Sequence, residues 1–99
     1  MYADEMKYDE VFKLKVLKAF VSDGVIKALP VQRKKRRVLL DMIVENFEFG
    51  ITYGEGEVNA VIKRYFDDYC TIRREMITEG LMTRNREQYM RLELPNDNG

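Results

Sequence analysis

The sequence predicts one small domain that is mostly helical and carries a β-hairpin near its C-terminal end. Its 99 residues suit a single hydrophobic core. Four stretches carry apolar residues at helical spacing, and two short strand-like stretches follow the last of them. Hydrophobic residues make up 45% of the chain and charged residues 34%, a balance typical of a folded soluble domain rather than a disordered segment.

The first helix is expected over residues 8–20, where apolar residues cluster on one side and lysines lie opposite. The Ser-Asp-Gly sequence at 22–24 is typical of a turn. The apolar piece 25–29 then ends at Pro30, which favours a brief strand or an ordered connector. A second helix is predicted to begin near Val31, with Gly50 marking its exit.

A helix-turn-helix is predicted in the middle of the chain. A single bridging strand is expected at 51–53, and a third helix begins at about Glu55. Asp67 or Asp68 caps a fourth helix over 69–79, which stops at Gly80. Two helices separated by so tight a turn resemble a helix-turn-helix.

The remaining segment predicts a wing. Residues 81–83 and 88–92 flank a polar turn and together predict a hairpin. The elements therefore predict a winged helix-turn-helix-like α+β domain over residues 8–94. A flexible N-terminus is expected at 1–7 and a disordered tail at 95–99.

Several classes of function are disfavoured by composition. The chain has no histidine and one cysteine, Cys70, so the usual general base, a thiol triad and a zinc site all lack their residues. No Gly-rich phosphate loop is present. We therefore expect no enzyme activity, no metal, no cofactor and no small-molecule substrate. No apolar run reaches the ~20 residues of a membrane span, and the N-terminus does not resemble a signal peptide, so a cytoplasmic protein is expected.

A basic run, Gln32-Arg33-Lys34-Lys35-Arg36-Arg37, is the main anomaly, because the overall charge is balanced at 17 basic and 17 acidic residues. Cations in the first turns of a helix oppose its dipole, so something must offset that cost. A phosphate backbone could do so, as could acidic residues such as Asp4, Glu5, Asp9 and Glu10. Helical phase puts Lys34 and Arg37 on the outer face with Asp41, and Arg36 over the core rim. Two interpretations of this run remain open. One is a phosphate-binding patch that includes Lys34, Lys35 and Arg37, and the other is a face that is solvated or paired within the domain.

The fourth helix carries two adjacent arginines with different expected roles. Arg73 lies between inward residues, so we expect a structural ion pair or hydrogen bond. Arg74 points outward with Thr71 and Thr78, and it has the length and donors to reach a phosphate or a guanine edge. Simple solvation of Arg74 is the alternative. The acidic residues of this helix, Glu75 and Glu79 among them, argue against DNA binding.

The predicted wing is also basic. Arg84, Arg86 and Arg91 flank Tyr89, and a basic hairpin tip is a common way to touch backbone phosphates beside a groove. A wing that only completes the core is the alternative for this segment.

Linked motifs extend the interpretation from approximately Val16 to Arg91. They are Leu29-Pro30 before the basic run and Leu39-Leu40, then Phe47-Glu48-Phe49-Gly50 with Tyr53, Glu57-Val58-Asn59, Asp67-Asp68 leading into Ile72-Arg73-Arg74-Glu75-Met76, and Gly80-Leu81-Met82-Thr83-Arg84. In order and spacing they resemble a bacterial family, domain of unknown function 2087. The resemblance implies a winged-helix-type module, alone or fused to helix-turn-helix regulators, and a transcription-linked setting without an assigned activity. The chain departs from the family at Gly54 and Gly56.

Two functions follow from this reading. The first is a small transcription-regulator-type protein that binds double-stranded DNA mainly through phosphate contacts. The second is a protein-interaction or dimerisation module, with a homodimer or another protein as partner and without direct DNA binding.

Overall fold

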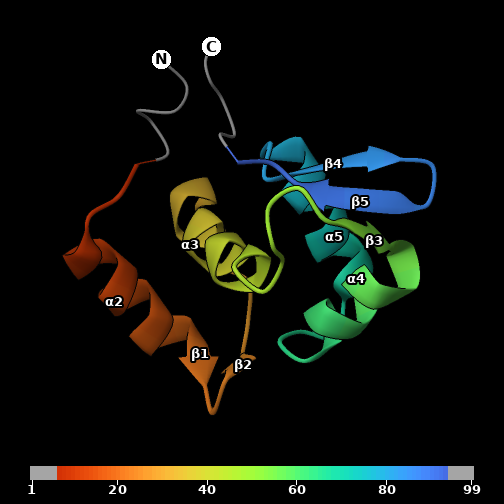
Figure 1. Cartoon of the computed structure of the whole chain (residues 1–99). Coiled ribbons are helices and arrows are strands. Elements are labelled where there is room, and N and C mark those ends of the chain that lie inside the picture. Colours follow the sequence, from red (N-terminus) through yellow and green to blue (C-terminus); the bar gives the residue numbers. More distant parts are fainter. Residues whose placement is uncertain (1–6, 94–99) are drawn as a thin grey trace.

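The computed structural model describes residues 7–93 as a small mixed α+β domain with four helices and two antiparallel sheets (Figure 1). The predicted α+β class of a small single domain is therefore confirmed. The elements are α2 (Glu10–Phe20), β1 (Val21–Ser22), β2 (Val25–Ile26), α3 (Arg33–Val44), β3 (Thr52–Gly54), α4 (Glu55–Lys63), α5 (Tyr69–Thr78), β4 (Met82–Asn85) and β5 (Gln88–Arg91). The expected flexible segment 1–7, apart from Lys7, and the expected tail 95–99 lie outside the described residues.

Helix α2 begins at Glu10, two residues later than predicted, because Asp9 is its N-cap and accepts a hydrogen bond from the Phe12 amide at 2.8 Å. The helix leads directly into the β1–β2 hairpin, in which Val21 pairs with Ile26 and Ser22 with Val25. Asp23 and Gly24, the two loop residues, have φ of 55° and 78°, the left-handed pair that a tight hairpin turn requires. The start of the segment 25–29, for which a brief strand or an ordered connector was predicted, is thus the second strand of a hairpin.

Helix α3 is shorter than the sequence predicts at both ends. Val31 is 93% exposed and precedes the helix, which begins at Arg33. The helix ends at Val44 rather than near Gly50, because the amides of Asn46 and Phe47 bond back to Ile43 and Val44 in tighter turns. These turns bury Phe47 against the core. Gly50, with φ 77°, lies in the loop that leads to β3.

Helices α4 and α5 match their predicted ranges closely. The side chain of Asp68 accepts a hydrogen bond from the Thr71 amide and caps α5, and Gly80 follows the helix with φ 77°. The two helices pack against each other, and α5 also packs against α3. Their inner faces contribute to one core, whose buried residues are Val16, Ile26, Val38, Leu39, Leu40, Ile43, Val44, Phe47, Val58, Ile62, Ile72, Met76, Leu81, Met82 and Tyr89.

The predicted hairpin forms part of a three-stranded antiparallel sheet with the strand order β3-β5-β4. Strand β5 is central, so Tyr89 pairs with Tyr53 on one side and with Arg84 on the other. Tyr89 points into the core and is 1% exposed. The β4–β5 hairpin extends on one side of the molecule, and α2 lies at the opposite end (Figure 1).

Candidate nucleic-acid interface

The outward face of α5 presents Arg74 and Thr78, both exposed. Within residues 7–93, the guanidinium of Arg74 makes no hydrogen bond or ion pair. Thr71 lies at the start of the same helix but is half-buried, because its amide and its hydroxyl both donate to the Asp68 carboxylate, at 3.3 and 2.7 Å. The capping interaction therefore occupies Thr71, whereas Arg74 and Thr78 remain available to a ligand.

The acidic residues of α5 face α3, where arginines of the basic run neutralise them. Glu75 forms an ion pair with Arg36, and Glu79 accepts from Arg33 Nε at 2.7 Å. Arg37 Nη1 also lies 3.8 Å from Glu79. The side chain of Glu79 is only 10% exposed. These carboxylates are thus held along the α3–α5 contact, and their charge is largely compensated before any phosphate approaches.

The basic run itself is mostly paired within the domain. Arg37 Nε donates to Asp41 at 3.0 Å, one helical turn along, and the Arg37 side chain is 15% exposed. The Lys34 ammonium lies 5.0 Å above the ring of Phe12. Lys35 is half-buried. The N-terminal acids expected to offset the run do not do so where they are described: Asp9 caps α2 instead, while Asp4 and Glu5 lie outside the described residues.

Arg73 belongs to a polar cluster between α4, α5 and the sheet, which we call the Glu55 cluster (Glu55, Asn59, Arg73, Arg84 and Tyr89). Arg73 Nη1 donates to Asn59 Oδ1 at 2.6 Å, and its other terminal nitrogen lies 4.0 Å from Glu55. Tyr89 donates its hydroxyl proton to Glu55 at 2.9 Å. Helical spacing in α4 alone predicts that Asn59 faces outward, and this prediction is wrong, because α5 packs against that side and Asn59 accepts the hydrogen bond from Arg73.

Burial raises the pKa of Tyr89, and its hydrogen bond to the Glu55 carboxylate adds to the shift. The phenol therefore remains a donor at neutral pH. Through this bond the first residue of α4 is tied to the central strand, while Arg73 ties α5 to the same α4 turn. The cluster thus links the three-stranded sheet to the two helices.

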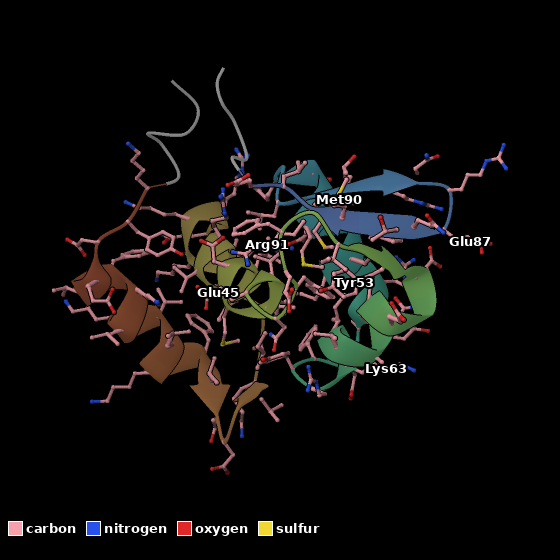
Figure 2. All side chains as sticks on the ribbon, in the orientation of Figure 1. Glu45, Tyr53, Lys63, Glu87, Met90 and Arg91 are labelled. Carbon is pink, nitrogen blue, oxygen red and sulfur yellow. The ribbon has the colours of Figure 1, made fainter. Side chains whose placement is uncertain are left out.

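The arginines of the hairpin have different surroundings. Arg84 is 53% exposed, lies 4.0 Å from Glu55 and donates from Nε to the backbone oxygen of Arg86 at 2.6 Å. Arg86 is exposed in the two-residue loop that joins β4 to β5. Arg91 instead packs over the Phe49 ring at 4.0 Å and donates to the Phe47 carbonyl at 3.0 Å. Figure 2 shows Glu87, the loop neighbour of Arg86, at the far end of the hairpin and Arg91 near α3, so Arg86 and Arg91 lie at opposite ends of the hairpin.

A small hollow of about 180 Å³ is lined by Tyr8, Arg37, Asp41, Phe49 and Arg91 among others. Its polar groups are already paired: the Tyr8 hydroxyl donates to Asp41, and Arg37 occupies the other oxygen of that carboxylate. Burial and the Asp41 bond raise the pKa of Tyr8. The hollow is smaller than the ~300 Å³ of the smallest usual ligand pockets.

Residues 7–93 contain no group of three or more acidic, cysteine or histidine side chains placed to hold a metal ion. In the same part of the chain, no helix is long and apolar enough to cross a membrane.

Comparison with known protein families assigns residues 25–91 to a family described as "Uncharacterized protein conserved in bacteria (DUF2087)". The chain belongs to this family. The match begins at Val25, later than the resemblance at approximately Val16 suggested, so α2 and β1 lie outside the family segment. The family segment holds the Glu55 cluster, the basic run and Arg74. Neither curated proteins nor solved structures give a significant match.

Proposed function

We propose that the domain is a small winged-helix transcription regulator that binds double-stranded DNA mainly through phosphate contacts in the bacterial cytoplasm. The order α3-β3-α4-α5-β4-β5, with a sheet in the order β3-β5-β4, supports this proposal. A winged helix places a strand before a helix-turn-helix pair and closes the sheet with a hairpin after it. In this arrangement α5 is the recognition helix and β4–β5 is the wing.

The proposal rests mainly on Arg74, an exposed arginine whose guanidinium makes no hydrogen bond or ion pair within residues 7–93. Its neighbours on α5 with charged side chains are engaged: Arg73 in the Glu55 cluster, and Glu75 with Arg36. Arg74 alone among these three adjacent residues projects an unpaired charge from the helix. A guanidinium in this position supplies five donors that suit a phosphate or the edge of a guanine.

The wing supplies the second group of contacts. Arg86 at the loop and the exposed part of Arg84 are placed to bind backbone phosphates beside the groove that α5 enters. Thr78 adds a hydroxyl on the outer face of α5. Lys34 and Lys35 contribute long-range attraction, whereas Arg37 would have to leave Asp41 and Glu79 to reach a phosphate. Thr71 serves first as a capping partner.

A salt titration tests this proposal. Fluorescence anisotropy of a labelled random duplex is measured from about 20 to about 200 mM salt, where phosphate contacts weaken steeply. We expect Arg74→Ala to weaken binding and to reduce the slope of log K against log salt by about one. Lys27→Ala removes the same charge from an exposed site that follows β2, where the Lys27 amide bonds to Phe20 at the end of α2, and should leave both quantities unchanged.

A protein-interaction module is the second candidate function. It is favoured by the internal pairing of the basic run, which leaves fewer cations for a phosphate backbone than the sequence suggests. If the wild-type protein binds no duplex at the lowest salt, the DNA proposal is wrong and this second function becomes the better one.

A further inference from the structure

Positive charge gathers between residues 11 and 35. This segment carries seven basic residues and one acidic residue, Asp23, although the whole chain has 17 of each. Arg33 is paired with Glu79 across the domain. Within residues 7–93, the ammonium groups of the other six form no ion pair or hydrogen bond; these residues are Lys13, Lys15, Lys18, Lys27, Lys34 and Lys35. The segment therefore presents a positive charge that the domain does not neutralise.

The outer side of α2 lies at the centre of this charge. At about 100° per residue, Val11, Leu14, Lys15 and Lys18 fall within one arc of about 100°. All four are exposed, and Val16 projects from roughly the opposite side into the core. The outer side of the helix thus combines two aliphatic side chains with two unpaired lysines.

Further lysines lie around this side of the helix. The Lys34 ammonium lies 5.0 Å over the ring of Phe12, an uncharged partner that leaves the lysine charge uncompensated. The Lys27 amide bonds to the Phe20 carbonyl, so Lys27 lies at the C-terminal end of α2. Lys13 is half-buried in α2 and adds to the same field. We call the exposed group the α2 lysine surface (Val11, Leu14, Lys15, Lys18, Lys27 and Lys34).

Acidic side chains lie only near the two ends of α2. They are Asp23 in the hairpin loop that follows the helix and, around its start, Asp9, Glu10, Asp41 and Glu45. Arg37 already neutralises Asp41. Residues 11–20 contain no acidic residue. An anionic surface that approaches the middle of α2 therefore meets cations alone.

The aliphatic side chains among the lysines favour a lipid surface over a nucleic acid. Charge and hydrogen bonds suffice to bind a phosphate backbone, and they give no reason to expose Val11 and Leu14, which are 62% and 57% exposed. An anionic bilayer binds both kinds of side chain. The aliphatic groups enter the boundary between headgroups and acyl chains, and lysine stems extend so that the ammonium groups reach the headgroups. Lysine is also a point charge without the planar fork that arginine offers to phosphates and bases, and the proposed DNA-binding face carries arginines.

We propose that the α2 lysine surface binds the anionic headgroups of a lipid bilayer, with α2 lying in the plane of the interface. Val11 and Leu14 contact the acyl chains, while the lysines contact the headgroups. Each lysine close to an anionic leaflet strengthens binding by about fivefold, so the attachment is reversible and depends on salt. Helix α2 lies at the opposite end from the β4–β5 hairpin (Figure 1) and precedes the family segment, so this inference stands whether or not the protein binds DNA.

Co-sedimentation of the full chain with lipid vesicles, without DNA, tests the inference. One set of vesicles contains equal parts of phosphatidylglycerol, which is anionic, and phosphatidylcholine. The second set contains phosphatidylcholine alone. We expect binding to the first set only, and a loss of that binding as salt rises. Equal binding to both sets would overturn the inference, as would no binding to the anionic vesicles at the lowest salt.

Three variants locate the binding surface. Lys15→Ala/Lys18→Ala should weaken binding to the anionic vesicles by about 25-fold. Leu14→Gln keeps the charge and should weaken it by about fivefold or more, because one leucine no longer enters the bilayer. Arg74→Ala removes an exposed and unpaired cation from α5 and should leave vesicle binding unchanged. Circular dichroism of each variant verifies that the helices remain folded.

Duplex DNA, measured with the same variants, separates a lipid surface from a second nucleic-acid surface. Leu14→Gln should weaken vesicle binding and leave duplex binding as it is in the wild type. A double lysine variant that loses duplex affinity but keeps its vesicle affinity contradicts the inference. So does an Arg74→Ala variant that loses as much vesicle affinity as the double lysine variant, since binding would then follow the overall charge.

Discussion

Arg73 and Arg74 are adjacent in α5 but occupy opposite environments. The Arg73 side chain is 12% exposed and donates a hydrogen bond to Asn59, whereas Arg74 is exposed and makes no hydrogen bond or ion pair within residues 7–93. One step along a helix turns the side chain by about 100°, which carries it from the α4 contact to the surface. The pair therefore separates the structural role of Arg73 from the binding role proposed for Arg74.

We predict that alanine substitutions at these two positions have complementary effects. Arg73→Ala removes a donor to Asn59 and a cation near Glu55, and should lower the free energy of unfolding by about 1–3 kcal/mol. Arg74→Ala should change it by less than ~0.5 kcal/mol. Urea denaturation measures stability, and the salt titration measures DNA affinity. Equal destabilisation by the two substitutions would contradict the assigned roles.

The ion pairs between α3 and α5 should couple energetically. We expect Glu79→Gln to destabilise the fold by about 1–2 kcal/mol, because Arg33 and Arg37 then face an uncharged amide in a partly buried contact. A double-mutant cycle with Arg37→Met should give a coupling energy of at least ~0.5 kcal/mol that decreases as salt rises. Additive effects of the two substitutions would show that the pair is too exposed to contribute.

The protein should lose stability at alkaline pH. The pKa values of Tyr8 and Tyr89 are raised in the folded chain, so the folded state holds its phenolic protons while the unfolded state releases them above about pH 10. The contribution is fully present below that pH and is lost as pH rises through the folded pKa. Each tyrosine should steepen the decline by up to ~1.4 kcal/mol per pH unit. Urea denaturation between about pH 8 and about pH 11 should show a shallower decline in Tyr8→Phe and in Tyr89→Phe.

The loop between β4 and β5 is strained at one residue. Arg86 has φ 61°, a left-handed value that L side chains other than asparagine and aspartate seldom adopt. Arg86→Gly should therefore raise the stability of the domain by about 0.5–1 kcal/mol while weakening DNA binding through the lost charge. Thermal denaturation together with the salt titration measures both effects. A gain in stability without any loss of binding would remove Arg86 from the proposed interface.

Features that depend on local sequence were predictable. Asp68 caps α5 and Gly80 follows it, as expected from the preferences of these residues at helix ends. The β4–β5 hairpin was predictable because a polar turn separates two strand-like stretches. The β1–β2 hairpin was missed although Asp23-Gly24 is a strong turn signal, because strands of two residues are too short to show alternation.

Contacts between helices were harder to predict from the sequence. Helical phase places Arg37 beside Asp41, since both lie in one helix. The partners of Arg33 and Arg36 are Glu79 and Glu75, which are distant in sequence and become neighbours only when α5 packs on α3. A helical projection of α4 alone likewise places Asn59 on the outer side. The projection contains no information about α5, which packs over that residue.

The central strand of the three-stranded sheet is also the last strand along residues 7–93. During synthesis β3 and β4 leave the ribosome first, and neither can pair until Gln88–Arg91 follows. The hydrophobic core likewise lacks Tyr89 until that moment. A nascent chain halted within the 85–88 turn would carry two unpaired strands and an open core, so the sheet and the core should be completed in a single step once Gln88–Arg91 has emerged.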